Sequence, residues 1–222
     1  MSVTSEQATP TRFERRRERT RAALVAAAQR LIAEGRTNVA VSDVTEIADV
    51  GTGTFYNHFT SKEELFEAAA HAAMERLGDV LALLNHDVDD PAEVFARAFR
   101  IVGRLHRVEP ELSLVVLRAS GPAPADDTGL VAHMRHDLER GRDAGRFDFD
   151  DLDVAATLVV GATVSLGFLL HEQPERDAES AVDETARHLL QSLGLGADDA
   201  RAVATAPLEP ALDTVSEQAR TT

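Results

Sequence analysis

Residues 41–65 read VSDVTEIADVGTGTFYNHFTSKEEL, which predicts a short helix, a tight turn, a second short helix and the capped start of a third. The second helix is expected over Thr52–Phe59. At about 100° per residue, Phe55 and Phe59 lie on one side of it and small polar residues on the other. A helix this short is unstable by itself in water, so both phenylalanines must dock on neighbouring helices. The remaining face is slim and rich in hydrogen-bonding groups, which suits insertion into a groove of DNA.

The length and composition indicate a soluble protein. The chain has 222 residues, enough for one or two domains with a sizeable core. It has no cysteine, which excludes disulfides and thiolate metal sites and fits a reducing cytoplasm. The N-terminal residues lack the apolar segment of a secretory signal. The longest uncharged apolar run, 154–170, is shorter than the roughly 20 residues of a membrane span, so we expect a buried helix there and a cytoplasmic location.

Charge is distributed unevenly along the chain. The net charge is −15, yet residues 12–36 carry eight arginines against three glutamates, and residues 1–60 hold eight basic and seven acidic side chains. The negative charge therefore belongs to residues 61–222. Such a split indicates one end that faces a polyanion and an acidic body. The alternative is that the arginines form a solvated tail, and the cluster alone does not decide between the two.

Apolar residues recur at helical spacing along most of the chain, and no segment shows the sustained alternation of a β-strand, so the predicted fold class is all-α. Ser42 is expected to cap one helix, and Ser61 with Glu64 to form the capping box of a long one. Helices are expected at about 15–34, 42–48, 52–59, 62–85, 91–107, 110–119, 127–141, 152–171 and 178–193, with room for a short one near 197–205.

Three strings carry a family resemblance: VSDVTEIA (41–48), VGTGTFYNHF (50–59) and SKEELF (61–66). Together they resemble the DNA-binding domain of the TetR (tetracycline-repressor) family of bacterial transcriptional regulators, over about residues 17–77. The resemblance implies an N-terminal three-helix helix-turn-helix domain, with its motif at 40–59, and a larger C-terminal helical ligand-binding and dimerisation domain. The implied function is sequence-specific DNA binding by a transcriptional regulator, in the first place a repressor released by a small-molecule effector.

The predicted organisation is a disordered arm at 1–14, a helix-turn-helix domain at 15–62, a ligand-binding and dimerisation domain at 63–195 and a frayed tail at 196–222. The sequence departs from the family pattern in the turn, where Asp49 replaces a usual glycine, and before the second helix, where Gly51 replaces a usual serine or threonine cap. Aspartate adopts the left-handed conformation less readily than glycine, so we expect the turn to survive at some cost.

The expected DNA contacts follow from side-chain chemistry and from the resemblance. Hydroxyl and amide groups at the start of the second helix suit base edges, and Gly53 allows a close approach of the backbone. By resemblance, Tyr56, His58 and Lys62 contact phosphates; the alternatives are a half-buried packing role for Tyr56 and a helix C-cap for His58. The DNA-binding candidates are Ser42, Thr52, Gly53, Thr54, Tyr56, Asn57, His58 and Lys62, with Arg15, Arg16, Arg17 and Arg19 for the backbone or minor groove.

A single helix-turn-helix offers too little contact for tight operator binding, so we expect a homodimer on palindromic double-stranded DNA, with reading helices about 34–36 Å apart. The helices 152–171 and 178–193 are the predicted interface, because small residues allow close approach and leucines supply apolar surface. The alternative is an ordinary core helix. The predicted interface residues are Leu158, Gly161, Ala162, Ser165, Leu166, Leu169, Leu189, Leu190 and Leu193.

By resemblance, the C-terminal domain encloses an effector pocket. Residues 67–222 contain no tryptophan or tyrosine, which argues against an aromatic cage for a cation and favours an aliphatic lining for a largely apolar effector. The alternative for each residue is solid core. The predicted lining is Phe95, Phe99, Val102, Leu105, His106, Leu112, Val115, Val116 and Phe168, with Arg104 or Arg118 as further polar candidates.

Other chemistry is weakly signalled. His133 and His136 have ligand-like spacing but lack further ligands, so we predict neither a metal nor a cofactor. The sequence has no G-x-S-x-G nucleophile motif and no phosphate-binding loop, and no enzymatic activity is predicted. Two alternatives remain open: a DNA-binding regulator controlled by a partner protein, and a helical enzyme or carrier with a fortuitous N-terminal resemblance.

Overall fold

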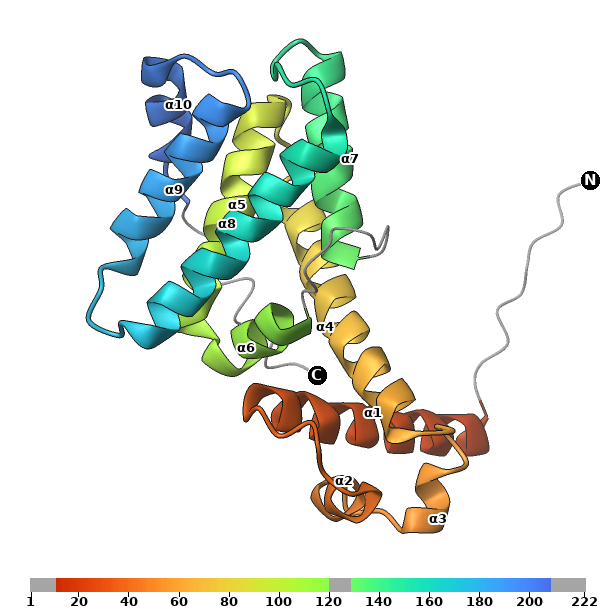
Figure 1. Ribbon diagram of the computed structural model, residues 1–222. Coiled ribbons are helices and arrows are strands. Elements are labelled where there is room, and N and C mark those ends of the chain that lie inside the picture. The colour runs from red at the N-terminus through yellow and green to blue at the C-terminus, as the bar shows by residue number, and fades with distance from the viewer. Residues whose placement is uncertain (1–10, 120–128, 209–222) are drawn as a thin grey trace, which may run out of the picture. The chain divides into compact units, whose positions relative to one another are not determined.

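The computed structural model describes residues 11–119 and 129–208, and all regular structure in these ranges is α-helical (Figure 1). The predicted all-α fold is confirmed. The chain divides into two compact units between Ala69 and Ala70. The helices are α1 (Arg12–Ala33), α2 (Val41–Ile47), α3 (Thr52–Phe55), α4 (Lys62–Leu84), α5 (Pro91–Val108), α6 (Pro110–Ala119), α7 (Gly129–Asp143), α8 (Leu152–Glu172), α9 (Ala178–Ser192) and α10 (Ala197–Ala204).

The N-terminal unit consists of α1, α2, α3 and the first turns of α4. α1 begins earlier than predicted because Thr11 forms a capping box. The Thr11 hydroxyl oxygen accepts a hydrogen bond from the Glu14 amide at 3.2 Å, and the Thr11 amide donates to the Glu14 carboxylate at 2.6 Å. The predicted disordered arm at 1–14 is therefore wrong for residues 11–14, and residues 1–10 lie outside the described residues.

Two details of the predicted helix-turn-helix are also corrected. The N-cap of α2 is Ala40, not Ser42, because the Ala40 amide donates to the Asp43 carboxylate at 2.9 Å. α3 is regular only to Phe55, and turns carry the chain on to Phe59, whose amide donates to the Phe55 carbonyl at 3.0 Å. The i to i+4 relation of the two phenylalanines survives the shorter helix, so both side chains are still buried.

The boundary between the units lies seven residues later than the predicted one at 62/63, because the start of α4 belongs to the N-terminal unit. Leu65 and Ala69 are fully buried. The Gln29 side-chain amide also donates to the Ala69 carbonyl at 2.9 Å. At the N-terminus of α4 the Ser61 hydroxyl oxygen accepts from the Glu64 amide at 3.1 Å, as predicted, but the Glu64 carboxylate accepts from Thr60.

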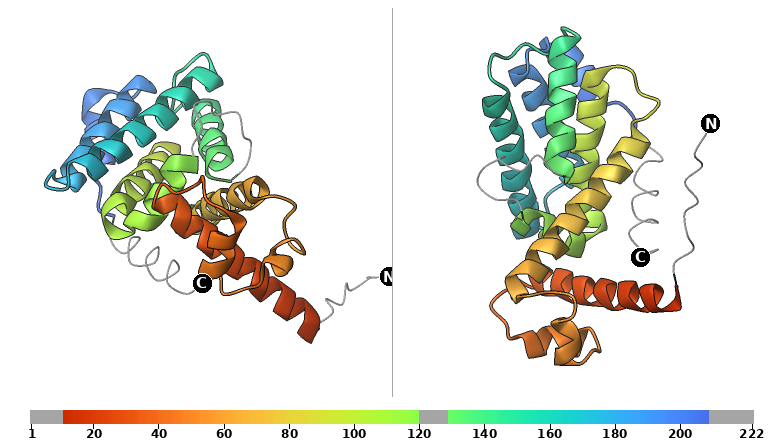
Figure 2. Two further views of the ribbon diagram at one scale, coloured as in Figure 1. Left: turned by 60° about the horizontal axis from the view of Figure 1, so that its bottom comes forward. Right: turned by 90° about the vertical axis from the view of Figure 1, so that its right-hand side faces the viewer.

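The C-terminal unit is organised around α5, which packs against α6, α7, α8, α9 and α10 (Figure 2). Because α5 is covered on most sides, its buried residues include polar ones, Arg100 and His106. α5 approaches α9 closely at Gly103, where a Cβ would lie 2.7 Å from the Val182 side chain. The central position of α5 places these two polar side chains in the interior of the unit.

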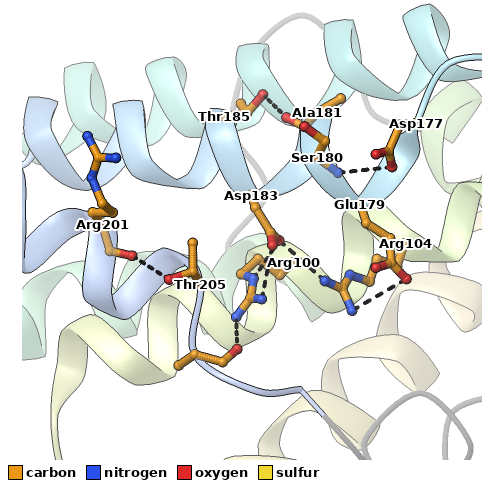
Figure 3. A network of polar contacts seen from close by, with 11 residues as sticks. Arg100, Arg104, Asp177, Glu179, Ser180, Ala181, Asp183, Thr185, Arg201 and Thr205 are labelled. Carbon is orange, nitrogen blue, oxygen red and sulfur yellow. Dashed lines mark hydrogen bonds and ion pairs between the residues drawn. The ribbon is translucent and has the colours of Figure 1, made fainter.

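A buried arginine links α5 to α9 and to the segment after α10 (Figure 3). Arg100 is 2% exposed. Its Nε donates to Asp183 at 2.7 Å and its Nη1 donates to the Ala206 carbonyl at 2.6 Å. Arg104 adds a longer bond to the same carboxylate at 3.4 Å. The charge of Arg100 is thus paired inside the unit.

The predicted frayed tail at 196–222 is wrong for residues 196–208. α10 occupies Ala197–Ala204, and its inner residues Ala200 and Ala204 are fully buried against the main core. Arg146 fixes its N-terminal end, because its guanidinium pairs with Asp90 and with Asp199. Residues 209–222 lie outside the described residues.

Candidate nucleic-acid interface and internal cavity

The turn between α2 and α3 depends on Asp49, which has a φ of 52°. The Asp49 amide donates to the Glu46 carbonyl at 3.2 Å and the Val50 amide to the Thr45 carbonyl at 3.0 Å, which are the two bonds of a Schellman motif. The same motif ends α1, where Gly35 has a φ of 72°. The turn therefore forms as expected, with a non-glycine residue in a conformation that costs about 1 kcal/mol.

α3 has one buried and one exposed face. Phe55 is 0% and Phe59 2% exposed, and their ring centroids are 6.0 Å apart. A Cβ at Gly53 would meet no atom within 4 Å, so the chain's own packing does not require glycine there. Tyr56 is 60% exposed, which argues against the half-buried packing role. The other predicted base-contacting positions are exposed at Thr52 and Asn57 and half-buried at Thr54.

His58 lies beside the basic end of α1. Partial burial, and then the positive charges of Arg17 and Arg21, lower the pKa of His58, which favours the neutral imidazole. The Arg21 guanidinium lies 5.3 Å from the centroid of the Phe59 ring, a cation–π distance. Arg21 is exposed and therefore belongs to the same candidate DNA-binding surface as His58 and Arg17. The predicted site omitted it, although its position one helical turn after Arg17 was the available signal.

The four arginines predicted to contact the DNA backbone or minor groove lie on α1. Arg15, Arg16, Arg17 and Arg19 are all exposed in the first turns of α1. At about 100° per residue, Arg15, Arg16 and Arg19 share one stripe, and Arg17 faces elsewhere. The positive charge is therefore carried by an ordered helix, which holds it in fixed positions.

Ser42 and Lys62 occupy helix starts. Ser42 is exposed in the first turn of α2, where backbone amides lack helical partners. Its carbonyl accepts from the buried Thr45 hydroxyl at 3.1 Å. The Lys62 ammonium donates to the Val39 carbonyl at 3.1 Å. Because an ammonium has three N–H groups, this bond leaves Lys62 able to donate to a phosphate as well.

The residues of the predicted dimer interface separate into three groups by burial. Leu166, Leu189, Leu190 and Leu193 are buried in the core of their own unit, so their assignment to an outer interface is wrong. Ala162 and Leu169 are half-buried against the same core. Leu158, Gly161 and Ser165 remain exposed on α8. The pattern could not separate these groups, because α8 is apolar on both faces.

The exposed side of α8 carries an apolar stripe that continues beyond the predicted residues. Val154 is 66%, Leu158 47% and Phe168 41% exposed. A Cβ at Gly161 would meet no atom within 4 Å. Among the described helices, α8 alone is long and apolar enough to span a membrane by length and composition, a test that core helices of soluble proteins also pass. We call Val154, Leu158, Gly161, Ser165 and Phe168 the α8 stripe.

The C-terminal unit contains a cavity of about 300 Å³. Its wall is mainly aliphatic and aromatic and comes from α4, α5, α6, α7 and α8 together with the α4–α5 connection. The polar lining residues are Asn85, His86, His106, His133, His136, Asp137, Arg140 and Thr163. Burial raises the pKa of Asp137, although nearby Arg140 and histidines oppose the shift.

Five predicted lining residues border this cavity: Phe95, Phe99, Val102, His106 and Val116. Leu105 and Val115 are buried elsewhere in the unit, Leu112 packs beside a second core cluster, and Phe168 faces outward, so these four are corrected. Arg104 pairs with Asp183 and is likewise absent from the lining. The contribution of α7 was not predicted, because the spacing of Leu130, Met134 and Leu138 indicates an inner face but not the cavity that this helix borders.

His106 belongs to a buried polar chain. Its Nδ1 lies 2.6 Å from the Ser113 hydroxyl oxygen, which lies 2.8 Å from His171 Nε2. The pKa of His106 falls to about 4, mainly through burial and then through the charges of His171 and Arg107, so its ring is neutral at pH 7. Gly167 of α8 makes room for the ring, because a Cβ there would lie 2.7 Å from His106 Cε1.

Comparison with known proteins identifies both units. Residues 23–69 match the family model described as bacterial regulatory proteins, tetR family, and residues 90–206 match the tetracyclin repressor-like C-terminal domain. No curated protein matches the chain. The chain therefore has a family-level match in each unit.

Solved structures agree. RolR, solved in complex with the ligand resorcinol, is 36% identical with a TM-score of 0.68, and the alignment covers 87% of this chain and 97% of that one. The fold is shared with TylP, a TetR regulator from Streptomyces fradiae, at 24% identity and a TM-score of 0.64 over 95% and 94% of the two chains. It is shared also with the fatty acid degradation regulator FadR from Bacillus halodurans, at 18% identity and a TM-score of 0.62 over 86% and 100%. With its polar-faced α3, its all-helical architecture and these matches, the chain belongs to the TetR family of DNA-binding transcriptional regulators.

Proposed function

We propose that this regulator is a homodimeric repressor that binds a palindromic operator and leaves it when a small, largely apolar effector occupies the cavity. The observation that carries the proposal is the division of α3 into a buried aromatic face and an exposed polar face. The second helix of a helix-turn-helix enters the major groove in this way, with its core-facing side fixed and its N-terminal residues at base edges.

Base recognition is assigned to the exposed face of α3. The hydroxyl groups of Thr52 and Thr54 can donate or accept hydrogen bonds, and their methyl groups can contact thymine. The Asn57 amide can bind adenine through two hydrogen bonds. Gly53 has open space in front of it and lets the backbone approach the groove.

Phosphate contacts are assigned to the groups around α3. Tyr56, neutral His58, Lys62 and Ser42 can each donate a hydrogen bond to a phosphate oxygen. The ordered arginines 15, 16, 17 and 19 of α1, together with Arg21, supply positive charge for the DNA backbone or the adjacent minor groove. Because residues 61–222 are strongly acidic, we expect a steep loss of affinity as salt concentration rises.

The dimer contact is assigned to the α8 stripe. Its residues follow one another at spacings of four and three, the repeat that places side chains along one seam between packed helices. Gly161 and Ser165 allow close approach, and Leu158 and Phe168 supply apolar area. We expect Leu158→Glu to give monomers with weak operator binding. Leu83→Glu is the matched control, because Leu83 of α4 is also an exposed leucine, at 59%.

The cavity is the proposed effector site. Its volume of about 300 Å³ is at the small end of ligand pockets, which suits a molecule the size of one ring. The resorcinol bound to RolR is of this size and class, and RolR resembles this chain over nearly its full length. An effector can release DNA only if it binds the non-operator conformation more tightly than the operator-bound one. We place this regulator in the cytoplasm, where DNA and metabolites are both accessible.

The DNA-binding proposal is tested by selecting duplexes from a random-sequence pool with the full-length protein and then measuring affinity by fluorescence anisotropy. We expect an enriched palindrome. Asn57→Ala should weaken binding to it by about 10- to 100-fold, the cost of one bidentate base contact. Gln173→Ala, which removes an exposed side-chain amide of the C-terminal unit, should change affinity less than threefold. Failure to enrich any sequence would refute the proposal.

A further inference from the structure

Two residues that line the cavity each have a buried polar atom without a hydrogen-bond partner. The atoms are His106 Nε2 and Asn85 Oδ1, in residues that are 4% and 8% exposed. Among the described residues, the other orphaned buried side-chain atoms are the Nε atoms of Arg97 and Arg104, which are not cavity residues. Native proteins rarely leave buried polar atoms unpaired, because each costs about 1–3 kcal/mol. Two such atoms in residues that line one cavity point to a ligand.

The His106 ring is held in a fixed position. Ser113, which is 1% exposed, lies between His106 Nδ1 and His171 Nε2 and occupies the inner nitrogen of His106. The other edge of the ring faces Gly167, beside Leu117: a Cβ at Gly167 would lie 2.9 Å from His106 Nε2 and 2.6 Å from Leu117 Cδ2. Because Nε2 is buried, binding through it requires a neighbouring side chain such as Leu117, which also lines the cavity, to change rotamer.

The chemistry of the two atoms defines the ligand. A serine between two neutral imidazoles can donate to either, so His106 Nε2 is a donor in one tautomer and an acceptor in the other. Asn85 Oδ1 is an acceptor only. A hydroxyl group both donates and accepts, and therefore satisfies each atom in either tautomer. An ether or a carbonyl lacks the hydrogen that Asn85 requires, and a charged group would lose its hydration in a wall that is mainly apolar.

We propose that the cavity selects an uncharged, ring-sized compound with hydroxyl groups, and that His106 Nε2 and Asn85 Oδ1 are the atoms that recognise those hydroxyls. The inference rests on the proposed effector site and adds its selectivity. Ser113 and His171 are positioning residues, since they act on the ligand only through His106.

The test measures binding of three probes to the purified full-length protein by isothermal titration calorimetry: resorcinol, 3-methoxyphenol and 1,3-dimethoxybenzene. The ring is constant in this series and the hydroxyl groups are replaced in turn. We expect wild type to bind resorcinol at least about tenfold more tightly than the dimethyl ether, which corresponds to one hydrogen bond. In His106→Phe and in Asn85→Leu the ratio of the two affinities should shrink by about tenfold. The affinity for resorcinol should fall, and the affinity for the dimethyl ether should change little.

Controls keep the result interpretable. His188→Phe changes an exposed histidine of α9 that pairs with Glu184 and does not line the cavity, and it should retain the preference. If His106→Phe does not fold, Asn85→Leu and the probe series still decide. For the positioning residues, His171→Gln keeps a nitrogen near the Ser113 hydroxyl and should retain the preference better than His171→Leu.

Equal binding of resorcinol and its dimethyl ether by wild type, or no binding of either hydroxylated probe, would overturn the inference. So would an unchanged preference in both His106→Phe and Asn85→Leu. These outcomes are separate from the fate of the repressor proposal, which is judged by operator selection and by release. Hydroxyl-selective binding that leaves the protein on its operator would support the inference and refute effector-controlled release.

Discussion

α3 and α8 each present one face to the chain's own core and one face outward, but the chemistry of the two outer faces differs. On α3 the inner face is aromatic and the outer face carries hydroxyl and amide groups. On α8 both faces are apolar, with Leu166 and Leu170 inside and Val154 and Leu158 outside. A polar outer face suits the hydrogen-bonding edges of DNA, whereas an apolar outer face suits a second protein surface.

The difference also decides what can be learned from a pattern of residues. Where polarity changes around a helix, the side that packs inward follows from the spacing. Where a helix is apolar on all sides, as α8 is, the burial of each residue must be known before any residue is assigned to an interface.

The largest effect is expected for Asp183 on the inner side of α9. Asp183→Ala removes the carboxylate that pairs with Arg100, which is 2% exposed, and should cost about 3–5 kcal/mol of unfolding free energy. Glu184→Ala, one residue later, removes an exposed carboxylate and should cost less than about 1 kcal/mol. Urea denaturation of both variants measures the two losses of unfolding free energy. Equal losses would contradict a stabilising role for the buried Arg100–Asp183 pair.

Leu190 and Leu158 compare an inner with an outer leucine. Leu190→Ala should destabilise the protein by about 2–5 kcal/mol, because the side chain is fully buried. Leu158→Ala should leave the unfolding of a dissociated protomer nearly unchanged and raise the concentration at which dimers separate. Denaturation and sedimentation velocity over a dilution series check the pair. A Leu158→Ala protein that dissociates like wild type would remove the α8 stripe from the interface.

His106 of α5, whose ring packs against Gly167 on the inner side of α8, should make the stability of the protein sensitive to acid. Its folded pKa of about 4 lies below the ordinary value of 6.5, so the unfolded chain binds more protons between these pH values. Stability should therefore fall as pH drops from 6.5 towards 4, by up to about 3 kcal/mol from this group. His106→Gln should flatten that part of the stability profile. An equally steep profile in the variant would assign the acid sensitivity to other groups.

The smallest effect is expected at the turn before α3. Asp49→Gly replaces a residue with a φ of 52° by one that adopts this conformation freely, and should stabilise the protein by about 1 kcal/mol. Gly35→Ala, at the equivalent position after α1, should destabilise it by a similar amount. Thermal unfolding of the two variants measures both signs, and a destabilised Asp49→Gly would indicate that the carboxylate has a role beyond the turn.

The sequence was sufficient for the all-α class, for most helix bounds and for the inner and outer faces of α3, because these depend on local spacing. It failed at Thr11, where a capping box extends α1. It allowed a short helix at 197–205 but not the burial of α10, which depends on packing against distant helices. It also led us to predict Leu189, Leu190 and Leu193 at the dimer interface, whereas they are buried in the core of their own unit. Asn85 and His106 both line the cavity although they come from different segments, and spacing along the chain does not predict which segments border one cavity.

The central claim is that the exposed face of α3 binds DNA in a two-fold symmetric dimer. Hydroxyl-radical footprinting of the full-length protein on its selected duplex tests it most directly. We predict two symmetry-related protected segments whose centres are one helical turn, about 10–10.5 base pairs, or a multiple of it apart, and their loss in Leu158→Glu. A single protected segment, or an unchanged footprint in Leu158→Glu, would contradict the account.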